Sequence, residues 1–186
     1  RTEIEVVLEA GVLELAALAV EGGAPMTDPR FRILSAEEDI RGDRRSIAGP
    51  TGRSSFVLPA GAYLVQAEEG QAAAEREIRV AAGERMEAEV VLDAGVLQVR
   101  AVEADGSAPS DRLRWEVLGA EEDLRGHRER VLGPTSRDQF VLPAGGYVVQ
   151  AQVEGRAARE EVTVVAGERV ELEITLPALD DPPEDG

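Results

Sequence analysis

The chain has 186 residues, of which 43% are hydrophobic and only 3% aromatic, and its formal net charge is −17. So acidic a surface repels phosphate backbones and anionic lipid, which argues against nucleic-acid and membrane-surface binding. The absence of cysteine excludes disulfides, thiol catalysis and thiolate metal sites, and no apolar run approaches the ~18–20 residues of a membrane span.

The sequence repeats itself with a period of 84 residues, and about half of the aligned positions are identical without any gap. AEEDIRG at 36–42 recurs as AEEDLRG at 120–126, and FVLPAGAYLVQA at 56–67 recurs as FVLPAGGYVVQA at 140–151. A fixed period of this kind indicates tandem modules. We therefore predict two domains, over 11–93 and 94–177, each large enough to bury a modest core.

The first segment, RTEIEVVLEA at 1–10, aligns with RMEAEVVLDA at 85–94. This alignment predicts that residues 1–10 are the last strand of a preceding, absent repeat. Thr2, Ile4, Val6 and Leu8 would form its apolar face, and the strand would lie against the first module or a neighbouring molecule.

Within each copy, apolar and polar residues alternate with a period of two, which is typical of strands with one buried face. Residues 72–77 could also form a helical turn. The predicted inward-facing residues are Phe31, Ile33, Met86, Ala88, Val90 and Leu92 in the first copy, and Leu97, Val99, Ala101, Leu113, Trp115, Val117, Val162, Val164, Val170, Leu172, Ile174 and Leu176 in the second.

Glycine- and proline-containing turns separate these strands every 8–12 residues, as at 21–23, 59–61, 82–83 and their counterparts at 105–106, 143–145 and 166–167. About seven short strands per copy, with no convincing long helix, predict an all-β protein built of two β-sandwiches. Only residues 93–95 separate the last strand of one copy from the first strand of the next. So short a connection predicts an end-to-end arrangement with limited bending.

Each copy resembles the carboxypeptidase regulatory-like modules, also described as CnaB-like or prealbumin-like β-sandwiches. The resemblance rests on GVLQVRAVEADGSAP at 95–109, FVLPAGGYVVQA at 140–151 and VTVVAGERVELEITL at 162–176, with the same pattern at 11–25, 56–67 and 78–92. It implies a non-catalytic Ig-like sandwich of the kind found in tandem in bacterial surface, secreted or periplasmic proteins. Many CnaB members form an isopeptide bond from a lysine. This chain has no lysine, so that cross-link cannot form here.

The candidate functional loops are acidic and occur in both copies: Glu37, Glu38 and Asp39, and Glu121, Glu122 and Asp123. Carboxylates in a sandwich loop could gather oxygen ligands for Ca²⁺ or form a binding surface. The loops lack the spaced oxygens of a dedicated calcium loop, however, and Arg41 and Arg125 can neutralise them. We therefore expect solvated or self-paired loops and no bound cofactor.

The remaining notable residues favour structural roles. Trp115 and its counterpart Phe31 are expected in the core, as are Tyr63 and Tyr147 with hydrogen-bonded hydroxyls. His127, the only histidine, is expected at the surface. No nucleophile–base motif or phosphate-binding glycine loop is present, so an enzyme is not expected.

The tail at 178–186 is acidic and proline-rich, which is typical of either a linker or a natural chain end. These observations predict a non-catalytic spacer, accessory or interaction module of a larger bacterial extracytoplasmic protein, with other repeats or domains of the same polypeptide as its partners. The alternative is a Ca²⁺- or carbohydrate-binding module that uses the loops at 37–42 and 121–126.

Overall fold

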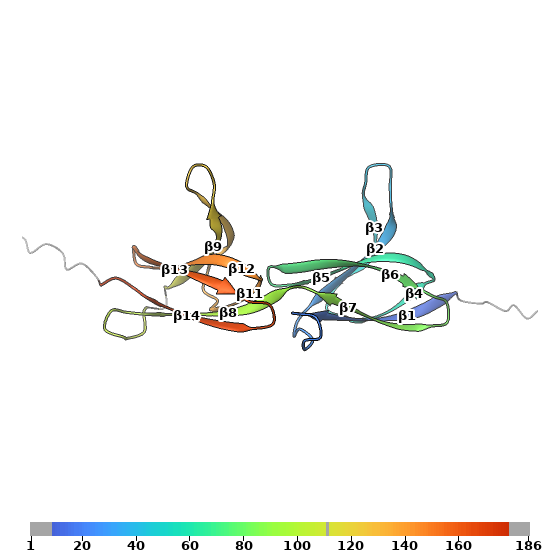
Figure 1. The fold of residues 1–186 in the computed structure, drawn as a ribbon, viewed down its shortest axis with the longest axis horizontal. Coiled ribbons are helices and arrows are strands. Elements are labelled where there is room, and N and C mark those ends of the chain that lie inside the picture. The colour runs from blue at the N-terminus through green and yellow to red at the C-terminus, as the bar shows by residue number, and fades with distance from the viewer. Residues whose placement is uncertain (1–8, 111, 179–186) are drawn as a thin grey trace, which may run out of the picture. The chain divides into compact units, whose positions relative to one another are not determined.

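The computed structural model describes residues 9–110 and 112–178, and these residues form fourteen strands and no helix (Figure 1). The chain divides into two compact units, Arg1–Asp93 and Ala94–Gly186. The all-β prediction with about seven strands per copy is confirmed. In the described residues, no helix is long and apolar enough to cross a membrane.

Every strand of the second unit begins and ends 84 residues after its counterpart in the first. The strands of the first unit are β1 (Ala10–Leu18), β2 (Arg30–Glu38), β3 (Arg44–Thr51), β4 (Ser55–Pro59), β5 (Gly61–Glu69), β6 (Ala72–Val80) and β7 (Arg85–Val91). Those of the second unit are β8 (Ala94–Val102), β9 (Arg114–Glu122), β10 (Arg128–Thr135), β11 (Gln139–Pro143), β12 (Gly145–Val153), β13 (Arg156–Val164) and β14 (Arg169–Thr175). Residues 72–77 thus belong to a strand, not to a helical turn.

Each unit is a two-layer β-sandwich. In the first unit a three-stranded sheet, in the order β4-β1-β7, faces a four-stranded sheet in the order β3-β2-β5-β6. The second unit repeats this arrangement as β11-β8-β14 and β10-β9-β12-β13. Neighbouring strands are antiparallel except β1 with β7 and β8 with β14, which are parallel.

The alternation of apolar residues positions the core between the two layers. In the second unit, Leu97 and Val99 of β8 and Ile174 of β14 meet Trp115 and Val117 of the facing sheet in one buried cluster. The predicted inward faces of these strands are therefore confirmed. Because the side chains are aliphatic and few are aromatic, the core depends on many moderate contributions of about 1.5–3 kcal/mol per buried side chain.

Strand β12 departs from simple alternation. Val148 and Gln150 point away from the core and yet are almost fully buried. The strand lies between β9 and β13 in the sheet, and Arg159 of β13 donates a hydrogen bond from its guanidinium to Oε1 of Gln150. The side chains of neighbouring strands thus cover the outer face of the second unit at this point.

Two predictions fall largely outside the described residues. The strand expected over 1–10 overlaps them only at Glu9 and at Ala10, where β1 begins, and the tail at 178–186 overlaps them only at Ala178. Both stay predictions.

Candidate functional site

The most prominent feature of each unit is a hairpin that projects from the sandwich. Strands β2 and β3 in the first unit, and β9 and β10 in the second, extend beyond the two sheets and end in turns at 39–43 and 123–127 (Figure 1). The pairing of β2 with β3 is interrupted by register shifts between Phe31 and Glu38. Such irregularities bend a strand away from its sheet, which explains why the hairpin leaves the body of the domain.

The turn of each hairpin is held by one of the predicted acidic residues. Oδ1 of Asp39 accepts hydrogen bonds from the backbone amides of Arg41, at 2.8 Å, and Asp43, at 3.0 Å. Asp123 does the same for Arg125 and His127, both at 2.8 Å. Aspartate commonly stabilises turns in this way, so these two carboxylates have a structural role.

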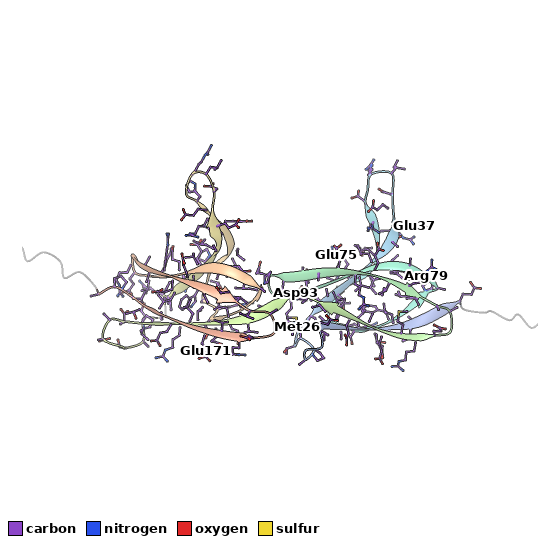
Figure 2. The ribbon with its side chains drawn as sticks, in the orientation of Figure 1. Met26, Glu37, Glu75, Arg79, Asp93 and Glu171 are labelled. Atoms are coloured by element: carbon purple, nitrogen blue, oxygen red, sulfur yellow. The ribbon has the colours of Figure 1, made fainter. Side chains whose placement is uncertain are left out.

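The other acidic residues of the loops either form an ion pair with an arginine or are exposed to solvent. Glu38 lies 2.8 Å from the guanidinium of Arg44, and Glu122 lies 3.1 Å from that of Arg128. Glu37 is exposed on the projecting hairpin (Figure 2), as is Glu121. Within 9–110 and 112–178, no group of three or more histidine or acidic side chains is arranged to hold a metal ion.

Sequence analysis missed what lies at the tip of each turn. Ile40 and Leu124 are fully exposed, at 103% and 107% of their reference areas. Both aliphatic residues directly follow the turn aspartate. An apolar residue inside an otherwise charged turn was the available signal, and it recurs in both copies.

The aromatic residues are in the core, as predicted. Trp115 is 2% exposed and Phe31 is fully covered. The hydroxyls of Tyr63 and Tyr147 donate hydrogen bonds to the carbonyls of Pro59 and Pro143, at 2.7 and 2.9 Å. Burial raises the pKa of Tyr147. Phe56 and Phe140 are buried as well, so all six aromatic side chains of the chain lie inside the sandwiches.

His127 is at the surface, as predicted, with 77% of its side chain exposed. Its Nδ1 lies 3.7 Å from Oδ1 of Asp123, which already accepts two backbone hydrogen bonds. The histidine therefore flanks the turn and faces no nucleophile.

The first unit has a shallow hollow of about 480 Å³ where the hairpin meets the outer face of the four-stranded sheet. Arg32, Ser46, Gln66 and Glu75 line it, together with two leucines. Ser46 is the only hydroxyl among the lining residues, and no histidine is among them to serve as its base. In the second unit Arg130 replaces Ser46 and forms an ion pair with Glu116.

One partly buried ion pair could not be anticipated from the sequence. Arg156 of β13 binds Glu103 through both terminal nitrogens, at 2.6 and 3.0 Å, and donates to the carbonyl of Pro177 at 2.8 Å. The side chains are only 12% and 21% exposed. Hydrogen bonds from Arg156 hold the pKa of Glu103 below its usual range. In the first unit the corresponding positions are Ala19 and Ala72, so this pair is a feature of the second unit.

Comparison with known proteins gives only distant likenesses. No protein-family model matches the chain, and no curated protein matches it. Among solved structures, the shaft pilin SpaA of Lactobacillus rhamnosus GG is 12% identical with a TM-score of 0.42, over 94% of this chain and 99% of the pilin. The minor pilin GBS52 of Streptococcus agalactiae is 13% identical with a TM-score of 0.36, over 95% and 100% of the two chains.

The Bacillus anthracis TIE protein is 15% identical with a TM-score of 0.32, and the chain spans 35% of that protein's length. Likenesses with such low TM-scores support no functional assignment. The β-sandwich fold rests on the strands and sheets described above.

Proposed function

We propose that the chain is a non-catalytic spacer or accessory part of a larger bacterial extracytoplasmic protein, with other repeats or domains of the same polypeptide as its partners. The observation that carries this proposal is the equivalence of the two units, strand for strand, with only Leu92 and Asp93 between β7 and β8. Repeated units joined so closely add length in equal steps, which is what a spacer requires.

The chemistry of the described residues favours this function over catalysis. The hollow beside β3 has one hydroxyl and no histidine among its lining residues, and His127 is exposed beside an aspartate that already stabilises a turn. Among the predicted acidic residues of the hairpins, the aspartates accept turn hydrogen bonds, two glutamates pair with arginines, and Glu37 and Glu121 are exposed.

The alternative, carbohydrate or Ca²⁺ binding by the hairpin loops, has less support. Carbohydrate recognition on β-sandwiches usually needs an exposed aromatic side chain on which a sugar ring can stack, and all six aromatic residues are buried. Ca²⁺ takes six to eight oxygen ligands, whereas Asp39 and Asp123 already bind backbone amides.

Calorimetric titration of the chain with Ca²⁺ tests the proposal. A spacer should give no saturable heat. A saturable heat that disappears in Glu37→Gln/Glu121→Gln, two exposed positions that do not hold the turns, would instead establish the hairpins as cation sites. Val57→Ser, at an exposed valine of β4, is the matched control on another surface.

A further inference from the structure

The parallel strand pairs join the beginning and the end of each unit. In the first unit, β1 pairs with β7 through seven residues in register, from Val12 with Arg85 to Leu18 with Val91. In the second unit, β8 pairs with β14 through seven more, from Val96 with Arg169 to Val102 with Thr175. The first and last strands of each sandwich are therefore direct neighbours.

This pairing determines how tension along the chain acts on a unit. In a parallel pair, the N-terminal end of β1 and the C-terminal end of β7 lie at opposite ends of the ladder, and in the first unit both strands can be followed in Figure 1. Pulling on these two ends slides one strand past the other. All the hydrogen bonds of the ladder then carry the force together, whereas a hairpin pulled at its open end loses its bonds one at a time.

Both ends of each ladder are extended by further backbone hydrogen bonds. In the first unit the amide of Val12 donates to the carbonyl of Glu84, and the amide of Leu92 donates to the carbonyl of Leu18, both at 2.8 Å. The second unit has the equivalent bonds from Val96 to Glu168, at 2.9 Å, and from Leu176 to Val102, at 2.8 Å.

Side chains also cross the parallel pairs. Glu14 and Arg85 form an ion pair between β1 and β7, and the Arg85 guanidinium that donates to it holds the pKa of Glu14 below its usual range. Arg100 and Glu173 lie 3.4 Å apart between β8 and β14. These pairs are exposed, so each contributes little stability by itself.

The core fixes the register of the parallel strands. Leu13 and Leu15 of β1 and Ala88 and Val90 of β7 are buried on the inner face. A slip of one residue would turn these side chains to the solvent and bring charged ones into the core. Sliding is therefore opposed by burial as well as by hydrogen bonds.

We infer that each unit is a mechanical clamp that resists extension of the chain, and that β1–β7 and β8–β14 are the parts that bear the tension. The clamp is non-covalent, because the chain contains neither cysteine nor lysine. With only Leu92 and Asp93 between β7 and β8, force that leaves the first clamp enters the second. This function goes beyond that of a spacer, which needs length but no resistance to force.

Single-molecule force spectroscopy in two pulling directions tests the clamp. Since the chain has no cysteine, handles can be attached at chosen positions. Glu9→Cys with Ala178→Cys loads both parallel pairs in shear, and Glu9→Cys with Glu84→Cys pulls β1 and β7 apart from the same end. We expect two unfolding events in the first geometry, each at several times the force needed in the second. Equal forces in the two geometries would refute the clamp and leave the spacer function intact.

A pair of proline variants in β14 locates the resistance. The amide of Leu176 faces β8, and residues two apart in a strand point the same way. The amide of Leu172 therefore faces β8 and that of Glu171 faces the free edge of the sheet. Leu172→Pro should lower the unfolding force of the second unit well below that of Leu172→Ala, which controls for the lost side chain. Glu171→Pro should leave the force unchanged, because proline is tolerated where the amide is unpaired.

The first unit serves as an internal reference in every one of these traces. If Leu172→Pro and Leu172→Ala unfold at the same force, the resistance does not lie in the β8–β14 ladder. If Leu172→Pro prevents folding, the comparison of pulling directions, which changes only exposed positions, still decides the question.

Discussion

At the scale of single residues, the structure distinguishes buried side chains that stabilise the fold from exposed ones that contribute little to its stability. Trp115 belongs to the core of the second unit at 2% exposure, whereas the His127 side chain is exposed in the turn of a hairpin. The two residues come from the same hairpin region, β9 to β10. They therefore form a matched pair for measuring how much burial contributes to the free energy of unfolding.

Replacing Trp115 by alanine should lower the free energy of unfolding of the second unit by about 3–5 kcal/mol, because a large buried side chain leaves a cavity. The change His127→Ala should alter it by less than about 0.5 kcal/mol. Chemical denaturation followed by circular dichroism measures both. A tryptophan variant as stable as the parent would show that the Trp115 side chain is not packed in the core.

The ion pair between Glu103 and Arg156 predicts a pH dependence for the second unit alone. Because the pKa of folded Glu103 is lowered, mainly by hydrogen bonds from Arg156, the pair stabilises the folded state above the unfolded pKa of about 4.3. That contribution is lost as the pH falls through the lower, folded value. Glu103→Gln should therefore destabilise the second unit at pH 7 and make its thermal unfolding less sensitive to acid between about pH 5 and 2.

The first unit has alanines at the two corresponding positions and is the control. Scanning calorimetry of the parent and the variant over this pH range gives the measurement. If the pH dependence of the unfolding temperature of the second unit is the same in the variant and the parent, Glu103 ionises alike in the folded and unfolded chains.

At the scale of elements, close packing between the start of β8 and the turn that joins β13 to β14 requires a glycine. A Cβ atom on Gly95 would lie 2.3 Å from the carbonyl oxygen of Val165 and 2.8 Å from Cγ1 of Val164. A Cβ atom on Gly11 of the first unit would likewise lie 2.3 Å from the carbonyl oxygen of Ala81.

The change Gly95→Ala should therefore destabilise the second unit by about 1–3 kcal/mol, as overpacking does. Gly119→Ala is the matched control within β9, since the nearest atom to its Cβ is 3.8 Å away. That variant should be neutral or slightly more stable, by up to about 1 kcal/mol, because glycine is unfavourable inside a strand. Equal effects of the two changes in urea unfolding would contradict the packing argument.

The strands themselves could be predicted from the sequence, because a period of two shows which face of a segment is buried. Thus Leu97 and Val99 were assigned correctly. The neighbours of a strand could not be predicted in this way. Nothing in the alternation of β1 indicates that it pairs in parallel with β7, in which Arg85 lies opposite Val12, 73 residues earlier in the chain. Pairing depends on topology, which a local pattern does not contain.

The candidate site could be predicted only in part, because its geometry also depends on structure that a local pattern does not contain. Repetition identified the acidic loops, but composition could not show that Asp39 would bind two backbone amides, because that depends on the turn conformation. The pair of Glu103 with Arg156 joins residues 53 apart in the sequence. Its first-unit counterparts are uncharged, so the repeat gave no indication of it.

At the scale of the whole molecule, the connection between β7 and β8 is two residues long. A compact globule of 186 residues would have a radius of gyration near 16 Å, at ~2.2·N^0.38. So short a connection predicts an end-to-end arrangement, for which small-angle X-ray scattering should give a clearly larger value. A value of about 16 Å would rule out the end-to-end arrangement.

The projecting hairpins have a practical consequence. Ile40 and Leu124 are fully exposed, and all the residues of the turns at 39–43 and 123–127 are exposed, so they contribute nothing to either core. Exposed loop tips of this kind tolerate insertions. A foreign peptide inserted between Leu124 and Arg125, or between Ile40 and Arg41, would be displayed away from the sandwich, so the chain offers two equivalent grafting positions for an epitope on one polypeptide.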